Sequence, residues 1–216
     1  MIYEERLTTL KEGGFEEYLD VYRNLEHPSV EDSGGHVLIR LNGLIGDDAN
    51  HVTQIIEYPS FESWTTYQNN RLNQIGSMSA LVEKEEVRLL RAISTRPKPA
   101  VPKVDYRSVY GLRRFLIESN DIDEFVHCSE KGIWPRIEAQ GACILCLWTT
   151  YSSTTPTEII LATGYRSPSH WEETRHGDGP IRNIDEALLL QEAPLRKRRA
   201  ELWSKSWVRL MKNLDL

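Results

Sequence analysis

Residues 52–64 read VTQIIEYPSFESW, and residues 159–171 read IILATGYRSPSHW. The two stretches match at a spacing of 107 residues, with a tyrosine, a serine and a tryptophan at the same places. Upstream, the same spacing joins further identical pairs without a gap: Tyr3 with Tyr110, Arg6 with Arg113, Glu17 with Glu124, Pro28 with Pro135, Glu31 with Glu138, Gly34 with Gly141 and Leu38 with Leu145. Self-similarity of this length indicates that one structural unit occurs twice in the chain.

The spacing changes after the second stretch. Residues 87–91, VRLLR, correspond to residues 208–212, VRLMK, at a spacing of 121, so the second copy carries 14 additional residues. We place this insertion near 176–194. Three prolines follow the first copy, and their fixed φ and missing N–H favour an extended linker. The sequence therefore predicts a first domain at 1–96, a proline-rich linker at 97–103 and a second domain at 104–216.

Each copy has the pattern of a βαββαβ unit. Strands are predicted at 2–10 and 109–117, each followed by a helix with apolar residues at helical spacing, two strands, a helix beginning after Ser60 or Ser167, and a closing strand. This order is the ferredoxin-like unit. Because its helices cover one face of the sheet, two linked copies can bury the other faces against each other. The predicted class is α+β, with two ferredoxin-like repeats forming an intrachain pseudo-dimeric α+β barrel.

Composition excludes several classes of function. With 40% hydrophobic and 27% charged residues, the 216-residue chain can bury an ordinary core. A net charge of -6 argues against nucleic acid and against an anionic membrane surface as partners. The longest strongly apolar stretch, 142–148, is far shorter than the roughly 18 residues of a membrane span. Three cysteines cannot all pair and nothing indicates export, which favours the cytoplasm.

Two short motifs carry a family resemblance. Residues 4–13 read Glu-x-Arg-x-x-x-Leu-Lys-x-Gly, and residues 112–117 repeat the pattern in the second copy. Together with residues 50–61 they resemble the NIPSNAP family of the dimeric α+β-barrel superfamily. The resemblance implies sites between sheet and helices or inside the barrel, in a superfamily that includes cofactor-independent monooxygenases, isomerases and haem enzymes. NIPSNAP proteins themselves have no defined biochemical role.

The chain departs from the family pattern in its third strands. Gln54 and Ile56 stand where the family often has His and Trp, and Leu161 and Thr163 stand there in the second copy. The usual turn proline is Glu12. The resemblance therefore does not extend to chemistry that relies on that histidine.

Arg6 and Arg113 are the first candidate ligand-binding residues. A ferredoxin-like unit places its first strand centrally, so these side chains face either the helices or the space between the sheets. An unpaired guanidinium beneath the helices would be costly. We expect both to face the space between the sheets and to hold a carboxylate or another anion. The alternative is an internal salt bridge, to Glu4, Glu5 or Glu57.

Aromatic and amide side chains complete the candidate site. Tyr58, Tyr165 and Trp148 could line an apolar pocket with polar tips, and ordinary core packing is the alternative. Gln54 joins the ligand-binding candidates because it breaks the symmetry of the copies, where Leu161 is its counterpart.

The sequence offers few candidate residues for acid–base catalysis or for metal binding. His36, on the predicted second strand, is the single catalytic candidate, with a surface histidine as the alternative. Cys143 and Cys146 lie three apart on a predicted strand, so regular alternation points them to opposite faces and argues against a metal site. The basic run 196–199 is interpreted as the solvated face of an amphipathic last helix that continues to Trp203 and Trp207.

The sequence therefore favours a NIPSNAP-like protein that binds a small, partly apolar molecule between the two sheets, with an anionic group as one option. A cofactor-independent monooxygenase or isomerase is the first alternative, and a non-catalytic interaction protein is the second. No cofactor is expected, and assembly into a homo-oligomer stays open.

Overall fold

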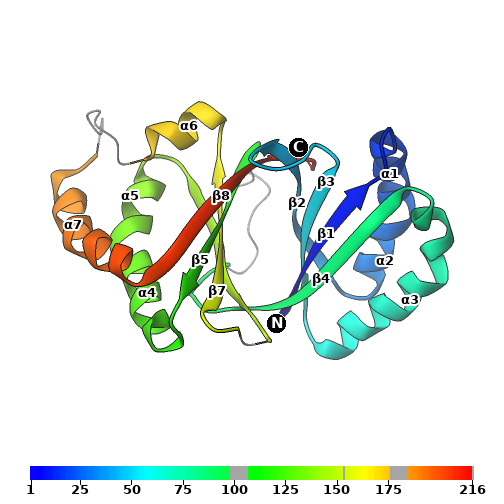
Figure 1. Ribbon diagram of the computed structural model, residues 1–216, viewed down its shortest axis with the longest axis horizontal. Coiled ribbons are helices and arrows are strands. Elements are labelled where there is room, and N and C mark those ends of the chain that lie inside the picture. The colour runs from blue at the N-terminus through cyan, green and yellow to red at the C-terminus, as the bar shows by residue number, and fades with distance from the viewer. Residues whose placement is uncertain (98–106, 153, 176–183, 216) are drawn as a thin grey trace. The chain divides into compact units, whose positions relative to one another are not determined.

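The computed structural model describes residues 1–97, 107–152, 154–175 and 184–215 (Figure 1). The chain divides into two compact units. Unit 1 comprises Met1–Arg91 and Lys212–Asp215, and unit 2 comprises Ala92–Met211. The linker predicted at 97–103 lies outside the described residues from residue 98 onward, so its conformation stays a prediction.

Unit 1 is a βαββαβ unit in which the first helix is interrupted by a π-helical turn. Its strands pair antiparallel in the order β4-β1-β3-β2. The elements are β1 (Ile2–Leu10), α1 (Phe15–Val21), the π-turn η1 (Tyr22–Glu26), α2 (His27–Asp32), β2 (His36–Ile45), β3 (His51–Tyr58), α3 (Phe61–Ser79) and β4 (Val82–Ala92).

Unit 2 repeats this order and adds a helix. Its strand order is β8-β5-β7-β6, with antiparallel pairing of β7 to both β5 and β6. The elements are β5 (Val109–Ile117), the 3₁₀ turn η3 (Ser119–Asp121), α4 (Ile122–Cys128), the π-turn η4 (Ser129–Ile133), α5 (Trp134–Ala139), β6 (Cys143–Thr150), β7 (Thr157–Tyr165), α6 (Pro168–Glu173), α7 (Glu186–Glu201) and β8 (Trp203–Asn213). The predicted strands 2–10 and 109–117 are confirmed.

Irregular features recur at the same spacing of 107. The π-turns η1 and η4 correspond, and so do β-bulges after Val37 in β2 and after Ile144 in β6. Gly34 and Gly141 both have positive φ, 76° and 88°, which a residue with a Cβ rarely adopts. Ser60 and Ser167, the serine caps of α3 and α6, each accept a hydrogen bond from the backbone N–H three residues on. The predicted duplication is confirmed in detail.

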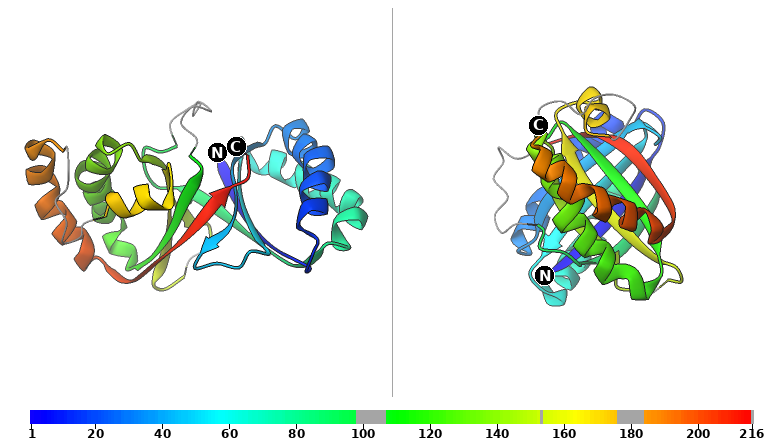
Figure 2. Two further views of the ribbon diagram at one scale, coloured as in Figure 1. Left: turned by 90° about the horizontal axis from the view of Figure 1, so that it is seen from above. Right: turned by 90° about the vertical axis from the view of Figure 1, so that its left-hand side faces the viewer.

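Helices cover one face of the sheet in each unit (Figures 1 and 2). In unit 1 the core beneath them is built from two groups of side chains: Leu10, Tyr18, Leu19, Val52, Met78 and Leu81, and then Tyr22, Val30, Val37, Ile56, Tyr58 and Tyr67. In unit 2 the core comprises Phe115, Ile117, Phe125, Trp134, Ile144, Leu147, Ile159, Leu161 and Leu202. The residues of each strand that face the helices are therefore identified by their packing.

The helix α7 distinguishes the second copy, which has two separate helices, α6 and α7, where the first copy has the single helix α3. Helix α7 packs on η4, where the Cβ of Leu195 lies 2.6 Å from the position that a Cβ on Gly132 would occupy. Only glycine permits this approach. Trp203 and Trp207 belong to β8, so the predicted continuation of the last helix to these residues is wrong. Residues 176–183 of the predicted insertion lie outside the described residues.

Truncation of Phe125 tests the core of unit 2. Its ring is fully buried and stacks edge-on against Phe115 at 4.8 Å between centroids. Phe125→Ala is expected to lower the free energy of unfolding by about 3–5 kcal/mol because it leaves a cavity. Urea denaturation measures the change. Phe61→Ala, at a side chain 51% exposed, is the matched control and should cost well under about 1 kcal/mol; equal losses would contradict the assigned core.

Candidate ligand-binding site

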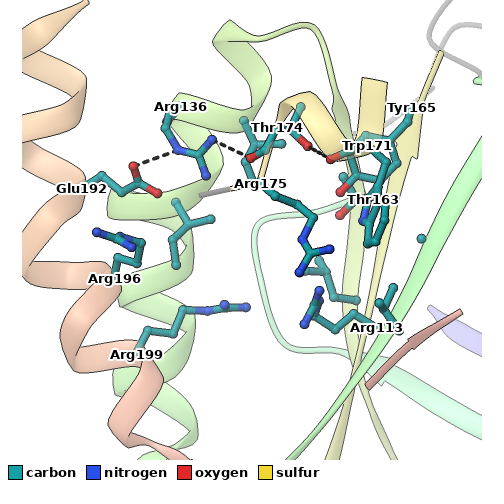
Figure 3. Close-up of a pocket in the computed structure, with 15 residues that line it drawn as sticks. Arg113, Arg136, Thr163, Tyr165, Trp171, Thr174, Arg175, Glu192, Arg196 and Arg199 are labelled. Carbon is teal, nitrogen blue, oxygen red and sulfur yellow. Dashed lines mark hydrogen bonds and ion pairs between the residues drawn. The ribbon is translucent and has the colours of Figure 1, made fainter. Parts of the chain in front are cut away.

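Unit 2 contains a pocket of about 230 Å³ between its sheet and its helices (Figure 3). The sheet contributes residues of β5, β7 and β8, and the helix side contributes η4, α5, α7 and the end of α6. The lining residues are Gly111, Arg113, Ile133, Arg136, Ile137, Leu161, Thr163, Tyr165, Trp171, Thr174, Arg175, Glu192, Arg196, Arg199 and Val208.

One of the five arginines in this lining is neutralised inside the protein. Arg136 forms an ion pair with Glu192 at 2.8 Å, and both side chains are almost completely buried. Arg136 also donates to the backbone carbonyl of Thr174 at 2.8 Å. This pair joins α5 to α7 and uses the carboxylate of Glu192, the only acidic residue among the lining residues that the structure describes.

The other four arginines have no carboxylate partner in the part of the chain that the structure describes. Arg113 donates to the hydroxyl of Ser206 at 3.3 Å. Arg175 lies over the ring of Trp171, 4.7 Å from its centroid. Arg113 is half-buried, whereas Arg175 and Arg196 are exposed at the pocket edge. Figure 3 shows Arg113 and Arg175 extending toward each other from the sheet and from the end of α6.

Arg199 is the most enclosed of these four cations. Its guanidinium lies 4.6 Å and 4.2 Å from the ring centroids of Phe115 and Phe125 and donates to the Ser129 hydroxyl at 2.7 Å. Burial, with a contribution from Arg113, lowers the pKa of Arg199 to about 9. That value is still above neutral, so the group stays charged at pH 7.

Burial also favours the neutral form of the titratable groups on the sheet. It lowers the pKa of Arg113, and the charge of Arg175 adds to this effect. Burial raises the pKa of Tyr165, so its phenol is neutral at pH 7 and can donate a hydrogen bond. The pocket therefore holds the poorly solvated charges of Arg113 and Arg199 beside an apolar wall that includes Ile137, Leu161 and Val208.

Arg6 has a different environment beneath α3 of unit 1. It contacts Glu4 and Glu85 at 2.7 Å each and lies 5.7 Å from the ring centroid of Tyr67. Although burial opposes it, these carboxylates raise the pKa of Arg6. Arg71 extends the network to Glu85 at 2.6 Å. The expectation that Arg6 faces the space between the sheets is corrected: it faces the helices, where the internal salt bridge to Glu4 forms.

The expectation that Arg113 faces the space between the sheets is corrected as well, because Arg113 faces the helices of its own unit. The structure brings Arg113 and Tyr165 together in the pocket lining and places the other candidates elsewhere. Tyr58 is buried beneath α3, 5.7 Å from Tyr67 between ring centroids. Gln54 is buried opposite Arg6 in the β1–β3 pairing.

The two remaining candidates lie on the sheet faces turned away from the helices. Trp148 is fully buried opposite Ile160 of β7. His36 is exposed at the start of β2, opposite Glu57. Neither lines the pocket of unit 2.

Sequence reasoning missed the contribution of α7. Glu192, Arg196 and Arg199 are spaced by four and three residues, which places them on one face of a helix. The interpretation of 196–199 as a solvated run holds for Arg198, which pairs with Glu124 on the surface. It is wrong for Arg199, which packs on two phenylalanine rings.

Cys143 and Cys146 do not point to opposite faces of the sheet, as regular alternation predicted. The bulge between Ile144 and Cys146 shifts the register, so Cys143 and Cys146 lie opposite Gly164 and Ala162 and share one sheet face. The Cys146 thiol donates to the backbone carbonyl of Arg96 at 2.9 Å. Within the described ranges, no group of three His, Cys, Asp or Glu side chains could hold a metal ion.

Comparison with known proteins identifies the fold. No protein-family model and no curated protein matches the sequence. A solved structure from Lactobacillus acidophilus NCFM, provisionally assigned as a monooxygenase, has a TM-score of 0.66 at 10% identity and covers 98% of this chain and 93% of that chain. An anthrone oxidase-like protein has a TM-score of 0.57 at 11% identity, covering 99% and 91%. At these identities the likeness shows a shared fold, in agreement with the predicted fold class.

NIPSNAP proteins are also among the similar structures. One from Agrobacterium tumefaciens str. C58 has a TM-score of 0.39 at 20% identity and covers 45% of this chain and 98% of that chain. No helix in the described residues is long and apolar enough to cross a bilayer.

The buried pair in unit 1 generates a stability prediction. Glu4→Gln leaves Arg6 buried with less negative charge and is expected to lower the free energy of unfolding by roughly 3 kcal/mol. Arg6→Met in the same chain should recover part of the loss, because it removes the cation. Chemical denaturation measures both. Glu86→Gln, which breaks an exposed pair with Lys84, should leave the midpoint unchanged; a Glu4→Gln protein of wild-type stability would contradict the assignment.

Proposed function

We propose that the protein binds a small, partly apolar anion in the pocket of unit 2. The observation that supports the proposal is a set of four arginines without a described carboxylate partner beside an apolar wall. The proposed site lies between sheet and helices, in place of the space between the two sheets that the sequence analysis favoured.

An anion would relieve an unfavourable distribution of charge. The described lining contains five guanidinium groups and one carboxylate, and that carboxylate is held by Arg136. A partly buried cation without a counter-charge costs free energy, and a bound anion offsets this cost through charge-assisted hydrogen bonds. The apolar wall would at the same time cover the hydrophobic part of the ligand.

The side chains of the pocket favour binding over catalysis. Among the residues that the structure describes, the lining includes no histidine, and Glu192 is held in its ion pair. Tyr165 has a raised pKa and is therefore a poor proton acceptor at neutral pH. The monooxygenase or isomerase alternative draws on a shared fold, and a fold does not define an activity.

Thermal unfolding in the presence of simple anions tests the proposal. Sulfate, phosphate, acetate and benzoate are compared with chloride at equal ionic strength. An anion that occupies the pocket at 100 times its Kd should stabilise the protein by about 2.7 kcal/mol. The proposal is wrong if none of the four raises the melting temperature above the chloride control.

Two substitutions test whether the stabilising anion binds in the pocket of unit 2. Arg113→Met is expected to abolish stabilisation by the anion while leaving the ligand-free protein as stable or more stable, since it removes a half-buried cation without orphaning a carboxylate. Arg198→Met is the matched control, because Arg198 lies on α7 outside the pocket lining and pairs with Glu124. Loss of the anion effect in both variants would indicate general surface electrostatics.

A further inference from the structure

The duplication places a filled version of the pocket in unit 1. Arg113 has the position of Arg6 on the first strand of its copy, and the strand partners correspond. Arg6 lies opposite Gln54, and Arg113 lies opposite Leu161, again at a spacing of 107. The serine caps of α3 and α6 fix the same correspondence for the helix residues.

In unit 1 the carboxylate of Glu4 is the acceptor for three donors. Its Oε1 accepts from Nε of Arg6 at 2.8 Å. Its Oε2 accepts from Nε1 of Trp64 at 2.7 Å and from Nε2 of Gln68 at 2.5 Å. The carboxylate is fully buried, so strand and helix residues together build a closed carboxylate site.

Unit 2 retains the three donor positions and lacks the acceptor. The counterparts of the donors are Arg113, Trp171 and Arg175, and all three line the pocket. The counterpart of Glu4 is Gly111, which also lines the pocket and has no side chain. The change at the third donor position, from glutamine to arginine, adds positive charge where the internal carboxylate has been lost.

A second carboxylate is replaced as well. Glu85 accepts from Nη1 of Arg6 at 2.7 Å. Its counterpart at the spacing of 121 is Ser206, whose hydroxyl accepts from Nη1 of Arg113 at 3.3 Å. The contact remains in place and its negative charge is gone.

An aromatic ring is removed from the same space. Tyr67 is fully buried over Arg6, and its hydroxyl donates to Glu26 at 2.7 Å. The counterparts in unit 2 are Thr174 and Ile133, and both line the pocket. A phenol and its polar acceptor in unit 1 therefore correspond to open space beside an apolar side chain in unit 2.

We infer that the pocket binds an aromatic carboxylic acid with one ring, whose carboxylate replaces that of Glu4 and whose ring replaces that of Tyr67. The inference rests on the proposed function and specifies its ligand class. The carboxylate accepts from Arg113, Trp171 and Arg175. A planar carboxylate matches the fork of a guanidinium, and a pocket of about 230 Å³ is below the roughly 300–1,000 Å³ of larger ligands.

Isothermal titration of the full chain with four probes tests the ligand class. Phenylacetate is compared with acetate, which lacks the ring, with phenylacetamide, which lacks the charge, and with phenylphosphonate, which has a tetrahedral anion. Phenylacetate should bind at least about tenfold more tightly than each of the others, in line with the cost of leaving buried polar groups unpaired.

Substitution of Ser206 tests the placement of the carboxylate. Ser206→Glu restores the counterpart of Glu85 and should weaken phenylacetate binding by about tenfold or more while raising the melting temperature of the ligand-free protein. Ser206→Gln has similar size without charge and should keep the affinity within about threefold. Thr174→Tyr, which restores the ring, should also weaken binding and serves if Ser206→Glu does not fold.

The outcomes separate the two proposals. If acetate or phenylphosphonate binds as tightly as phenylacetate and Arg113→Met abolishes both, the aromatic carboxylate is wrong and the anion site stands. Equal affinity for phenylacetamide would overturn the carboxylate assignment. Unchanged phenylacetate affinity in Ser206→Glu would overturn its placement. If no probe binds, the proposed function itself fails.

Discussion

A guanidinium beneath a helix layer is costly without negative charge, and the two units differ in whether their own side chains meet that requirement. Each carries an arginine on a central strand, where the helices exclude much of the solvent. Unit 1 meets the requirement internally, with Glu4 and Glu85 on Arg6. Unit 2 has a glycine and a serine at the corresponding places. The same backbone thus supports a saturated charge network in one copy and a positively charged pocket in the other.

The sequence predicted most of the fold because identical residues at a constant spacing report on a shared backbone. The strands 2–10 and 109–117 and the helix starts after Ser60 and Ser167 appear as expected. The π-turns and bulges were not predicted, because each depends on one extra residue whose free-energy cost is offset by tertiary packing. The missed bulge in β6 invalidated the alternation argument for its two cysteines.

The site was only partly predictable. Arg113 and Tyr165 were selected from the repeat and do line the pocket. Alternation along a strand shows which residues share a face but not which face the helices cover, so Arg6 and Arg113 were expected on the face opposite to the one they occupy. The role of Arg199 depends on how α7 packs against η4, where Arg199 stands at the place of Met78 in α3 of the first copy at the spacing of 121. Its surroundings of phenylalanine rings could not be inferred from a run of basic residues.

The helix α7 has a consequence for the dynamics of unit 2. It supplies two pocket arginines, and its attachment includes the Arg136–Glu192 pair and the close approach of Leu195 to Gly132. Local unfolding of this helix would remove part of the pocket wall. Any ligand that contacts it therefore binds only the docked form and lowers the population of the open one by mass action. Occupancy of the pocket and amide-exchange protection of α7 are in this way two measures of one equilibrium.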